Sequence, residues 1–172
     1  MKKYLFVCMG NICRSPMAEG IVREVFRKNN ISAIIDSAGT ISMHQGESPD
    51  RRAQQELAKH NINISNLRAR KITPYDLENF DFIFAMDKSN YDFIINKASE
   101  SQKKKVDLFM NIYEPKKNIS IPDPYYDNGF DLNYAMILKS AQVLASNILI
   151  GLLEREKKSD IYSYSPLILY SR

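Results

Sequence analysis

The chain has 172 residues, of which 44% are hydrophobic and 26% charged, as expected for one globular domain. Its net charge of +4 favours anionic ligands, but the sequence lacks the long basic blocks of nucleic-acid-binding proteins. We find no secretory signal, no apolar run long enough to span a bilayer and only two cysteines. We therefore expect a cytoplasmic protein with no disulfide framework and no membrane or nucleic-acid partner.

The first forty residues predict a strand, a helix and a second strand. Lys3–Val7 is apolar and rich in strand-forming side chains, and Ala33–Ser37 has the same character. Between them, apolar side chains recur at helical spacing and predict a helix over Pro16–Lys28, with Ser15 as its N-cap. This order predicts a parallel strand pair joined by a right-handed crossover.

The rest of the chain continues this alternation of strands and helices. Further helices are predicted over Asp50–His60, from Thr73, over Tyr91–Ala98 and over Leu132–Lys158. Further strands are predicted over Phe82–Ala85 and Val106–Met110, and irregular chain over Ile41–Pro49 and Pro115–Pro124. Four short strands separated by helices predict an α/β fold, with helices on both faces of a parallel sheet and ligands at the carboxyl ends of its strands.

The segment CMGNICRSP, residues 8–16, joins the first predicted strand to the first predicted helix. Gly10 and Asn11 tolerate a positive φ, so this loop turns successive backbone N–H groups inward, toward the positive end of the helix dipole. Such a loop is an anion cradle. Cys8 at its start and Arg14 at its end face the same bound oxyanion, and a cysteine at a helix N-terminus is favoured as the nucleophilic thiolate.

Two motifs more than a hundred positions apart resemble one known family. Val7–Pro16 is similar to the signature of the low-molecular-weight protein tyrosine phosphatases, and Asp123–Asp127, DPYYD, is similar to the general-acid loop of that family. The resemblance covers residues 2–156, so we predict a phosphatase domain over 1–158 and a C-terminal extension over 159–172. It implies a three-layer sandwich with strand order 2-1-3-4, no cofactor or metal, phosphate or sulfate bound in the loop, and a monomer or weak dimer.

The reaction that fits these residues is in-line displacement at phosphorus. Cys8 attacks, Arg14 and the loop amides hold the equatorial oxygens, and water then releases phosphate from the sulfur. A tyrosine leaving group has a pKa of about 10, so its departure needs a proton donor. The resemblance assigns that role to Asp123, which predicts a rate that is highest on the acidic side of neutrality.

The resemblance also implies roles for residues around the nucleophile. Ser15 donates a hydrogen bond to the thiolate, and Asn11 holds the turn of the loop with Ser37 as its partner. Cys13 is either a resolving thiol that forms a reversible disulfide with Cys8 or a buried small apolar residue. The residues expected to bind substrate are Met9, Gly10, Asn11, Ile12, Cys13, Ser15, Met43, His44, Tyr125 and Tyr126.

Two positions depart from the family pattern. Met43 stands where many members have a tryptophan, and His44 beside it offers a polar replacement. Leu67 stands where a histidine commonly supports the loop asparagine. Neither departure affects the nucleophile, the arginine or the acid.

Four other functions use a similar cysteine loop. Arsenate reductases need a further downstream cysteine, which this chain lacks, and a phosphoryl-carrier module of a sugar transport system does not need Asp123. Protein-arginine phosphatases typically carry a small polar residue where this chain has Ile12. A non-catalytic phosphate-binding module could lose both Cys8 and Asp123. The residues present therefore favour hydrolysis of phosphotyrosine.

The segment Ile161–Tyr170 alternates polar and apolar residues beyond the usual end of the family. This pattern predicts an added edge strand or a segment that docks on a helix. A regulatory role through phosphorylation of its tyrosines is the alternative.

Overall fold

The computed structural model describes the backbone of residues 1–163 and the surroundings of side chains as far as residue 153. Its sheet contains β1 (Lys2–Cys8), β2 (Ala33–Gly39), β3 (Phe82–Ala85) and β4 (Val106–Leu108). All paired strands are parallel, and their order is β2-β1-β3-β4. The predicted α/β class and the strand order 2-1-3-4 are confirmed.

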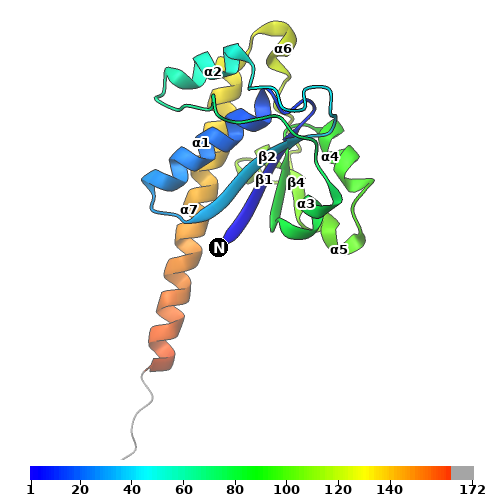
Figure 1. Ribbon diagram of the computed structural model, residues 1–172. Helices are drawn as coiled ribbons and strands as arrows, with labels where there is room; N and C mark the ends of the chain where they lie inside the picture. The colour runs from blue at the N-terminus through cyan, green and yellow to red at the C-terminus, as the bar shows by residue number, and fades with distance from the viewer. Residues whose placement is uncertain (164–172) are drawn as a thin grey trace, which may run out of the picture.

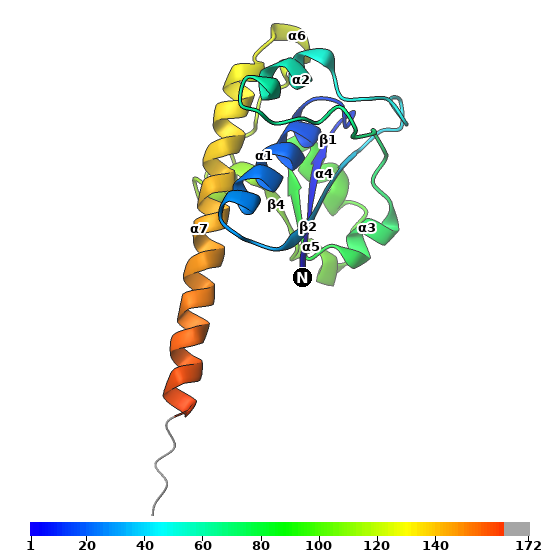
Figure 2. The ribbon, with the colours of Figure 1, turned by 60° about the vertical axis from the view of Figure 1, so that its left-hand side comes forward.

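Helices cover both faces of this sheet (Figures 1 and 2). One face carries α1 (Arg14–Lys28), α2 (Arg51–Ala58) and α7 (Phe130–Ser163). The other carries α3 (Pro74–Asn79), α4 (Lys88–Ile95) and α5 (Glu100–Lys103). The 3₁₀ helix η1 (Phe109–Ile112) follows β4, and the short helix α6 (Pro124–Asp127) precedes α7.

The central strand β1 explains why two hydrophobic cores form. Successive side chains of a strand point to opposite faces of the sheet. Tyr4 and Phe6 accordingly belong to the core beneath α1 and α7, whereas Leu5 and Val7 belong to the core beneath α3 and α4. Because both faces are buried, the strand is continuously apolar, and it places Cys8 at its carboxyl end.

Helix α1 begins at Arg14, two residues earlier than predicted, with Cys13 at the N-cap. Ser15 and Pro16 therefore lie inside the first turn, and the expected cap at Ser15 was wrong. The hydroxyl of Ser15 contacts Asn11 and Cys8 instead of capping the helix. The end of the helix that faces the loop thus keeps unpaired backbone N–H groups.

Other predicted boundaries also shift where a local contact decides them. Helix α4 begins at Lys88 because Asp87 caps it by accepting a hydrogen bond from the backbone of Asn90. The fourth strand ends at Leu108, and the last residues assigned to it form η1. By contrast, Asp50 caps α2 as predicted, with its carboxylate accepting from the backbone of Arg52.

Helix α7 corrects the expectation that no segment could span a bilayer. By length and composition alone, its stretch Phe130–Leu153 is long and apolar enough to cross a membrane. The same stretch buries Ile137, Ala141 and Ala145 in the core that α1 covers, although only 28% of its most apolar part is buried. Beyond this contact, α7 extends away from the sheet (Figure 2).

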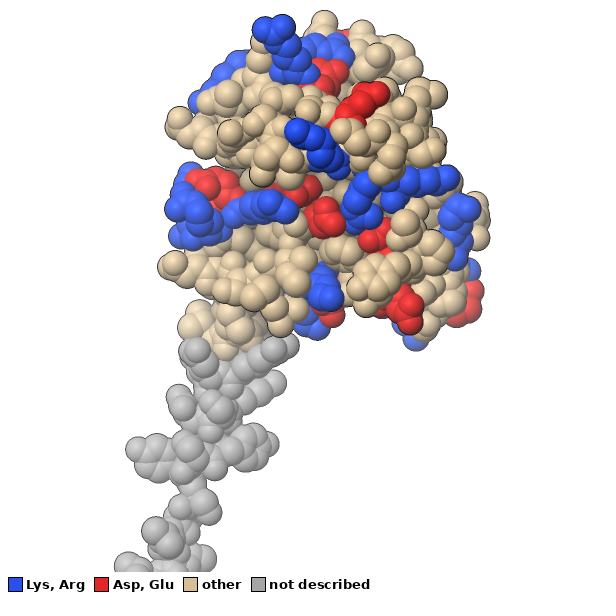
Figure 3. All heavy atoms as spheres, in the orientation of Figure 1, with Lys and Arg blue, Asp and Glu red and all other residues tan. Residues whose placement is uncertain are grey.

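The predicted extension over 159–172 falls partly within α7, which continues to Ser163. The alternating segment Ile161–Tyr170 otherwise lies outside the described residues. On the face seen in Figure 3, basic and acidic side chains are interspersed.

Candidate active site

The loop between β1 and α1 turns its carbonyl groups outward. The carbonyls of Cys8 and Met9 accept from the backbones of Thr40 and Ile41, and that of Ile12 accepts from Asp50 at 2.7 Å. With these carbonyls fixed to flanking segments, the amides of Gly10, Ile12, Cys13 and Arg14 donate to no group in the described part of the chain. The loop therefore has the backbone polarity of an anion-binding site.

Asn11 adopts the left-handed conformation that the sequence predicts, with a φ of 55°. Gly10, which would also tolerate a positive φ, does not adopt one. The glycine that the loop requires is Gly39 in β2, where an added Cβ atom would lie 2.7 Å from the carbonyl oxygen of Met9. Only glycine lets β2 approach the loop backbone this closely.

Cys8 lies at the floor of the loop, buried with 3% of its surface exposed. Its Sγ is 3.0 Å from Ser15 Oγ and accepts from the backbone N–H of Asn11 at 3.3 Å. A hydroxyl that can donate and a backbone N–H that does donate therefore meet at the sulfur. Such donors favour the thiolate form of a cysteine.

Arg14 is held between two acidic residues from distant parts of the chain. Its Nη1 group donates to Asp87 at 2.5 Å and to the carbonyl of Ile121 at 3.0 Å, and its Nη2 donates to Asp123 at 3.0 Å. Burial alone lowers the pKa of Arg14, but the charges of Cys8, Asp87 and Asp123 raise it above its ordinary value. The guanidinium keeps its Nε proton and the second Nη2 proton for an oxyanion.

Asp123 lies at the start of α6 and within reach of the loop. Its carboxylate caps α6 by accepting from the backbone of Tyr125, and it also contacts Arg14. Arg52 of α2 fixes this acid loop by donating to the carbonyl of Tyr125 at 3.1 Å and to Asn128 at 2.7 Å. The side-chain ring of Tyr125 lies beneath the Arg52 guanidinium, 5.2 Å from its carbon.

A cavity of about 400 Å³ opens over the loop. Its lining includes eleven residues that the sequence predicts for the site and adds one, Ile41. The lining residues are Cys8, Met9, Gly10, Ile12, Cys13, Arg14, Ile41, Met43, His44, Asp123, Tyr125 and Tyr126. The remaining predicted residues, Asn11, Ser15 and Ser37, do not line the cavity and are buried.

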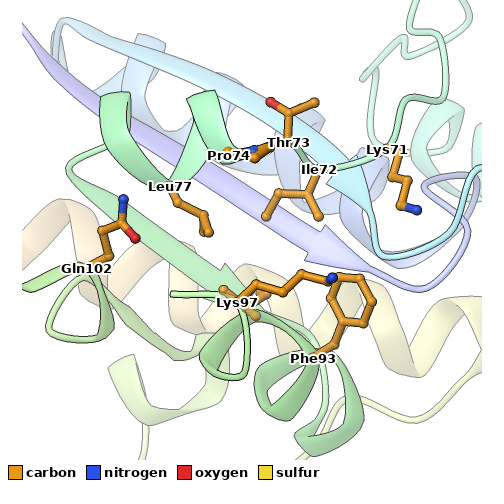
Figure 4. Close-up of a pocket in the computed structure, with 9 residues that line it drawn as sticks. Lys71, Ile72, Thr73, Pro74, Leu77, Phe93, Lys97 and Gln102 are labelled. Atoms are coloured by element: carbon orange, nitrogen blue, oxygen red, sulfur yellow. The ribbon is translucent and has the colours of Figure 1, made fainter. Parts of the chain in front are cut away.

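A second hollow of about 410 Å³ lies between α3, α4 and α5 (Figure 4). Ile72, Leu77 and Phe93 give it an apolar wall, and Lys97 extends over the ring of Phe93 at 5.0 Å. Its lining has no cysteine, histidine, aspartate or glutamate, so it lacks a thiol, an imidazole and a carboxylate. The cavity over the loop is therefore the candidate active site.

Comparison with known proteins agrees with this geometry. The family model described as low molecular weight phosphotyrosine protein phosphatase matches residues 3–158. The chain belongs to this family. The human low molecular weight phosphotyrosine protein phosphatase is 42% identical over 134 residues, which are 76% of this chain and 84% of the human protein.

Two solved structures resemble this member of the low molecular weight phosphatase family. A protein tyrosine phosphatase from Entamoeba histolytica, with Hepes in its active site, superposes with a TM-score of 0.82 at 33% identity and covers 88% of this chain and 99% of its own. A Drosophila arginine phosphatase superposes with a TM-score of 0.77 at 36% identity and covers 86% of this chain and 98% of its own.

The sequence patterns did not assign several residues that shape this phosphatase site. Asp87 and Arg52 fix the arginine and the acid loop, and Gly39 makes room for the loop backbone. The backbone N–H of Arg70 donates to Asn11 Oδ1 at 2.9 Å, so the loop asparagine is supported although Leu67 replaces the common histidine. Asp87 was detectable as a polar residue at the carboxyl end of β3, whereas the other contacts cross long sequence separations.

Proposed function

We propose that the protein hydrolyses phosphotyrosine in proteins, and small aryl phosphates, through a phosphoryl-cysteine intermediate on Cys8. The observation that carries this proposal is that the Cys8 sulfur, the Arg14 guanidinium and the Asp123 carboxylate border one cavity. Arg14 and the inward amides bind the three equatorial oxygens, and Asp123 protonates the phenolic oxygen. Asp123 then takes a proton from the water that attacks the intermediate.

An aryl substrate is supported by the walls of the cavity. Tyr125 and Tyr126 stand at its rim with their rings 5.3 Å apart in an edge-on arrangement, and 48% of Tyr125 is exposed. Ile12 and Met43 add apolar surface beside the loop. A flat aromatic leaving group gains contact with such a wall, whereas a charged guanidinium loses hydration against the branched side chain of Ile12.

The substrate class is tested with three phosphopeptides of one sequence that carry phosphotyrosine, phosphoserine or phosphoarginine. We expect kcat/KM for phosphotyrosine to exceed the other two values by at least about 100-fold, as inorganic phosphate release will measure. The similarity to an arginine phosphatase makes phosphoarginine the informative competitor. Faster release from phosphoarginine would assign the protein to that alternative function.

We also propose that Cys13 protects the nucleophile from oxidation. Cys8 and Cys13 are both free thiols in this structure. Burial raises the pKa of Cys13 strongly, and the charges of Asp50 and Cys8 raise it further, so Cys13 is an uncharged thiol at neutral pH. Peroxide then oxidises Cys8 to a sulfenic acid, and Cys13 displaces water from it to form a disulfide.

The redox role predicts how activity recovers after peroxide treatment. Wild-type enzyme is expected to regain most of its activity with dithiothreitol, whereas Cys13→Ser loses it irreversibly because its Cys8 oxidises further. Activity is compared before peroxide, after peroxide and after reduction. Equal recovery by the two proteins contradicts the proposal.

The cellular setting follows from the same chemistry. Because the proposed nucleophile is the thiolate of Cys8, we infer a reducing, cytoplasmic compartment. We propose a phosphotyrosine-containing protein as the partner, phosphate or sulfate as a ligand of the loop, and a monomer or weak dimer in solution.

A further inference from the structure

A buried carboxylate lies behind the phosphate-binding loop and has no part in the chemistry above. Glu19 of α1 is 2% exposed, and its Oε2 accepts a hydrogen bond of 2.5 Å from Ser37 Oγ in β2. Its Oε1 lies 2.5 Å from Nη2 of Arg23, which also donates to the carbonyl of Ile35. A buried carboxylate is unfavourable unless it is paired and hydrogen-bonded, and Glu19 meets both conditions.

A continuous series of hydrogen bonds joins Glu19 to the nucleophile. Asn11 Nδ2 donates to Ser37 Oγ at 3.0 Å and to Ser15 Oγ at 2.9 Å. Ser15 Oγ in turn lies 3.0 Å from Cys8 Sγ. All of these side chains are buried, with exposed fractions between 0% and 4%, so they satisfy one another rather than bind bulk water.

The direction of each bond in this series follows from the donors available. The backbone N–H of Arg70 donates to Asn11 Oδ1, which fixes the orientation of the amide. An amide nitrogen has two protons and no acceptor, so Ser15 and Ser37 both accept from Asn11. Each hydroxyl then has a single proton left to donate.

The charge on Glu19 gives the Ser37 proton its acceptor. A carboxylate can only accept, so the Ser37 proton points to Glu19 and the Ser37 lone pair stays available to Asn11. Asn11 then donates its second amide proton to Ser15. The Ser15 hydroxyl proton is therefore left to donate to the sulfur of Cys8. The alternative acceptor for Ser15 is the carbonyl of Ala38 at 3.3 Å.

We propose that Glu19 is a positioning residue for the nucleophile, and that Arg23 keeps it ionised so that Ser37 donates to Glu19, Asn11 donates to both serines and Ser15 donates to Cys8. The proposal rests on the proposed function, because it takes Cys8 as the nucleophile. Ordered donors at the sulfur favour the thiolate before attack and stabilise it as the leaving group in the second step.

The electrostatics of Glu19 support a functional reason for its charge. Burial raises the pKa of Glu19 above its ordinary value, against the hydrogen bond from Ser37 and the charge of Arg23. Asp36 also raises it and Arg70 lowers it. A glutamate with a raised folded-state pKa reduces stability as pH rises through that pKa, so a neutral replacement is not expected to destabilise the protein at pH 7.

The first test is Glu19→Gln, which preserves shape and removes charge. Arg23 is a donor only, so it attracts the single amide oxygen of the glutamine and turns the amide nitrogen toward Ser37. This reverses the Ser37 bond, so the buried Ser37 proton loses its acceptor and competes with the backbone N–H of Arg70 for Asn11 Oδ1, which disturbs the ordered series. We expect kcat on p-nitrophenyl phosphate to fall about tenfold or more while the melting temperature is unchanged or higher.

The second test is the double variant Glu19→Gln/Arg23→Met. Without the guanidinium, the amide oxygen can accept from Ser37 again, so the double variant is expected to be more active than Glu19→Gln. Arg23→Met alone leaves an unpaired glutamate, and the acidic limb of its pH–kcat/KM profile is expected to move to higher pH. Arg27→Met is the matched control, because Arg27 lies one turn further along α1 and pairs with Glu24, which is partly exposed and has no contact with the phosphate-binding loop among the described hydrogen bonds.

A readout at the sulfur separates positioning from general structure. The rate at which iodoacetamide alkylates Cys8 at pH 6 reports the thiolate, and fragmentation of the peptide 4–14 distinguishes Cys8 from Cys13. We expect slower alkylation in Glu19→Gln, partial recovery in the double variant and no change in Arg27→Met. This readout needs no turnover, so its result is independent of the substrate that the enzyme hydrolyses.

Two results would overturn the proposal. One is wild-type alkylation and turnover in Glu19→Gln, and the other is a double variant no more active than Glu19→Gln. If Glu19→Gln does not fold, Arg23→Met tests the proposal instead. An acidic limb of its pH–kcat/KM profile that is the same as in the wild type contradicts the role of the Glu19 charge.

Discussion

Replacing Cys8 by serine is expected to lower kcat for phosphotyrosine and for p-nitrophenyl phosphate by at least about 10⁴-fold. The serine hydroxyl is not ionised at neutral pH, and the groups in contact with it, the Ser15 hydroxyl and the backbone N–H of Asn11, are not bases that can take its proton efficiently. The oxygen is also smaller than sulfur, so the site keeps its packing. Steady-state release of inorganic phosphate measures the loss.

Phosphate binding provides the internal control for Cys8→Ser. Arg14 and the inward amides remain, so we expect inorganic phosphate to raise the melting temperature of the variant as it does that of the wild type. An inactive variant that no longer responds to phosphate would indicate a disrupted loop. Retained phosphotyrosine turnover in a phosphate-responsive variant would rule out a phosphoryl-cysteine mechanism.

The second large effect is expected for Asp123→Asn. The asparagine oxygen can still cap α6 at Tyr125, but the side chain cannot protonate the leaving group. We expect kcat for phosphotyrosine to fall by about 10²–10⁴-fold, and by less for aryl esters whose phenols are more acidic. The series is measured as kcat against the pKa of the leaving phenol.

The pH dependence of the rate provides a second test of the role of Asp123. The wild-type rate is expected to fall on the alkaline side, as Asp123 loses its proton, and Asp123→Asn is expected to lack that fall. Asp127→Asn is the matched control, because Asp127 ends the short helix that Asp123 caps, and among the described residues its carboxylate accepts a hydrogen bond only from the backbone of Gly129. Equal leaving-group dependence in wild type and Asp123→Asn would show that another group acts as the acid.

The strands and the loop of the site were predictable because their information is local. Lys3–Val7 and Phe82–Ala85 are short apolar runs with no competing helical spacing, and the structure has strands over Lys2–Cys8 and Phe82–Ala85. The residues between Cys8 and Arg14 are consecutive, so one strand end and one helix start suffice to bring them around an anion. The two motifs also specified the family.

Helix ends were less predictable because a polar side chain can form its hydrogen bonds either with the adjacent helix end or with residues far away in the sequence. Ser15 is a residue type that often caps a helix, yet its hydroxyl forms hydrogen bonds with Asn11 and Cys8 instead. Asp87 follows a strand and could have been a turn residue, yet it caps α4 and binds Arg14, 73 positions away. A single-sequence pattern records the type of the side chain and not the partner it finds.

The sequence by itself determined the sheet and the family, and it predicted the anion-binding loop and the proposed roles of Cys8, Arg14 and Asp123, since each depends on neighbouring residues or on a recognisable motif. Only the tertiary structure decided how these groups are held. Gly39, Arg70 and Glu19 meet the loop from β2, from a later connection and from within α1. Their contacts form when the chain packs, and no spacing in the sequence encodes which proton each one donates or accepts.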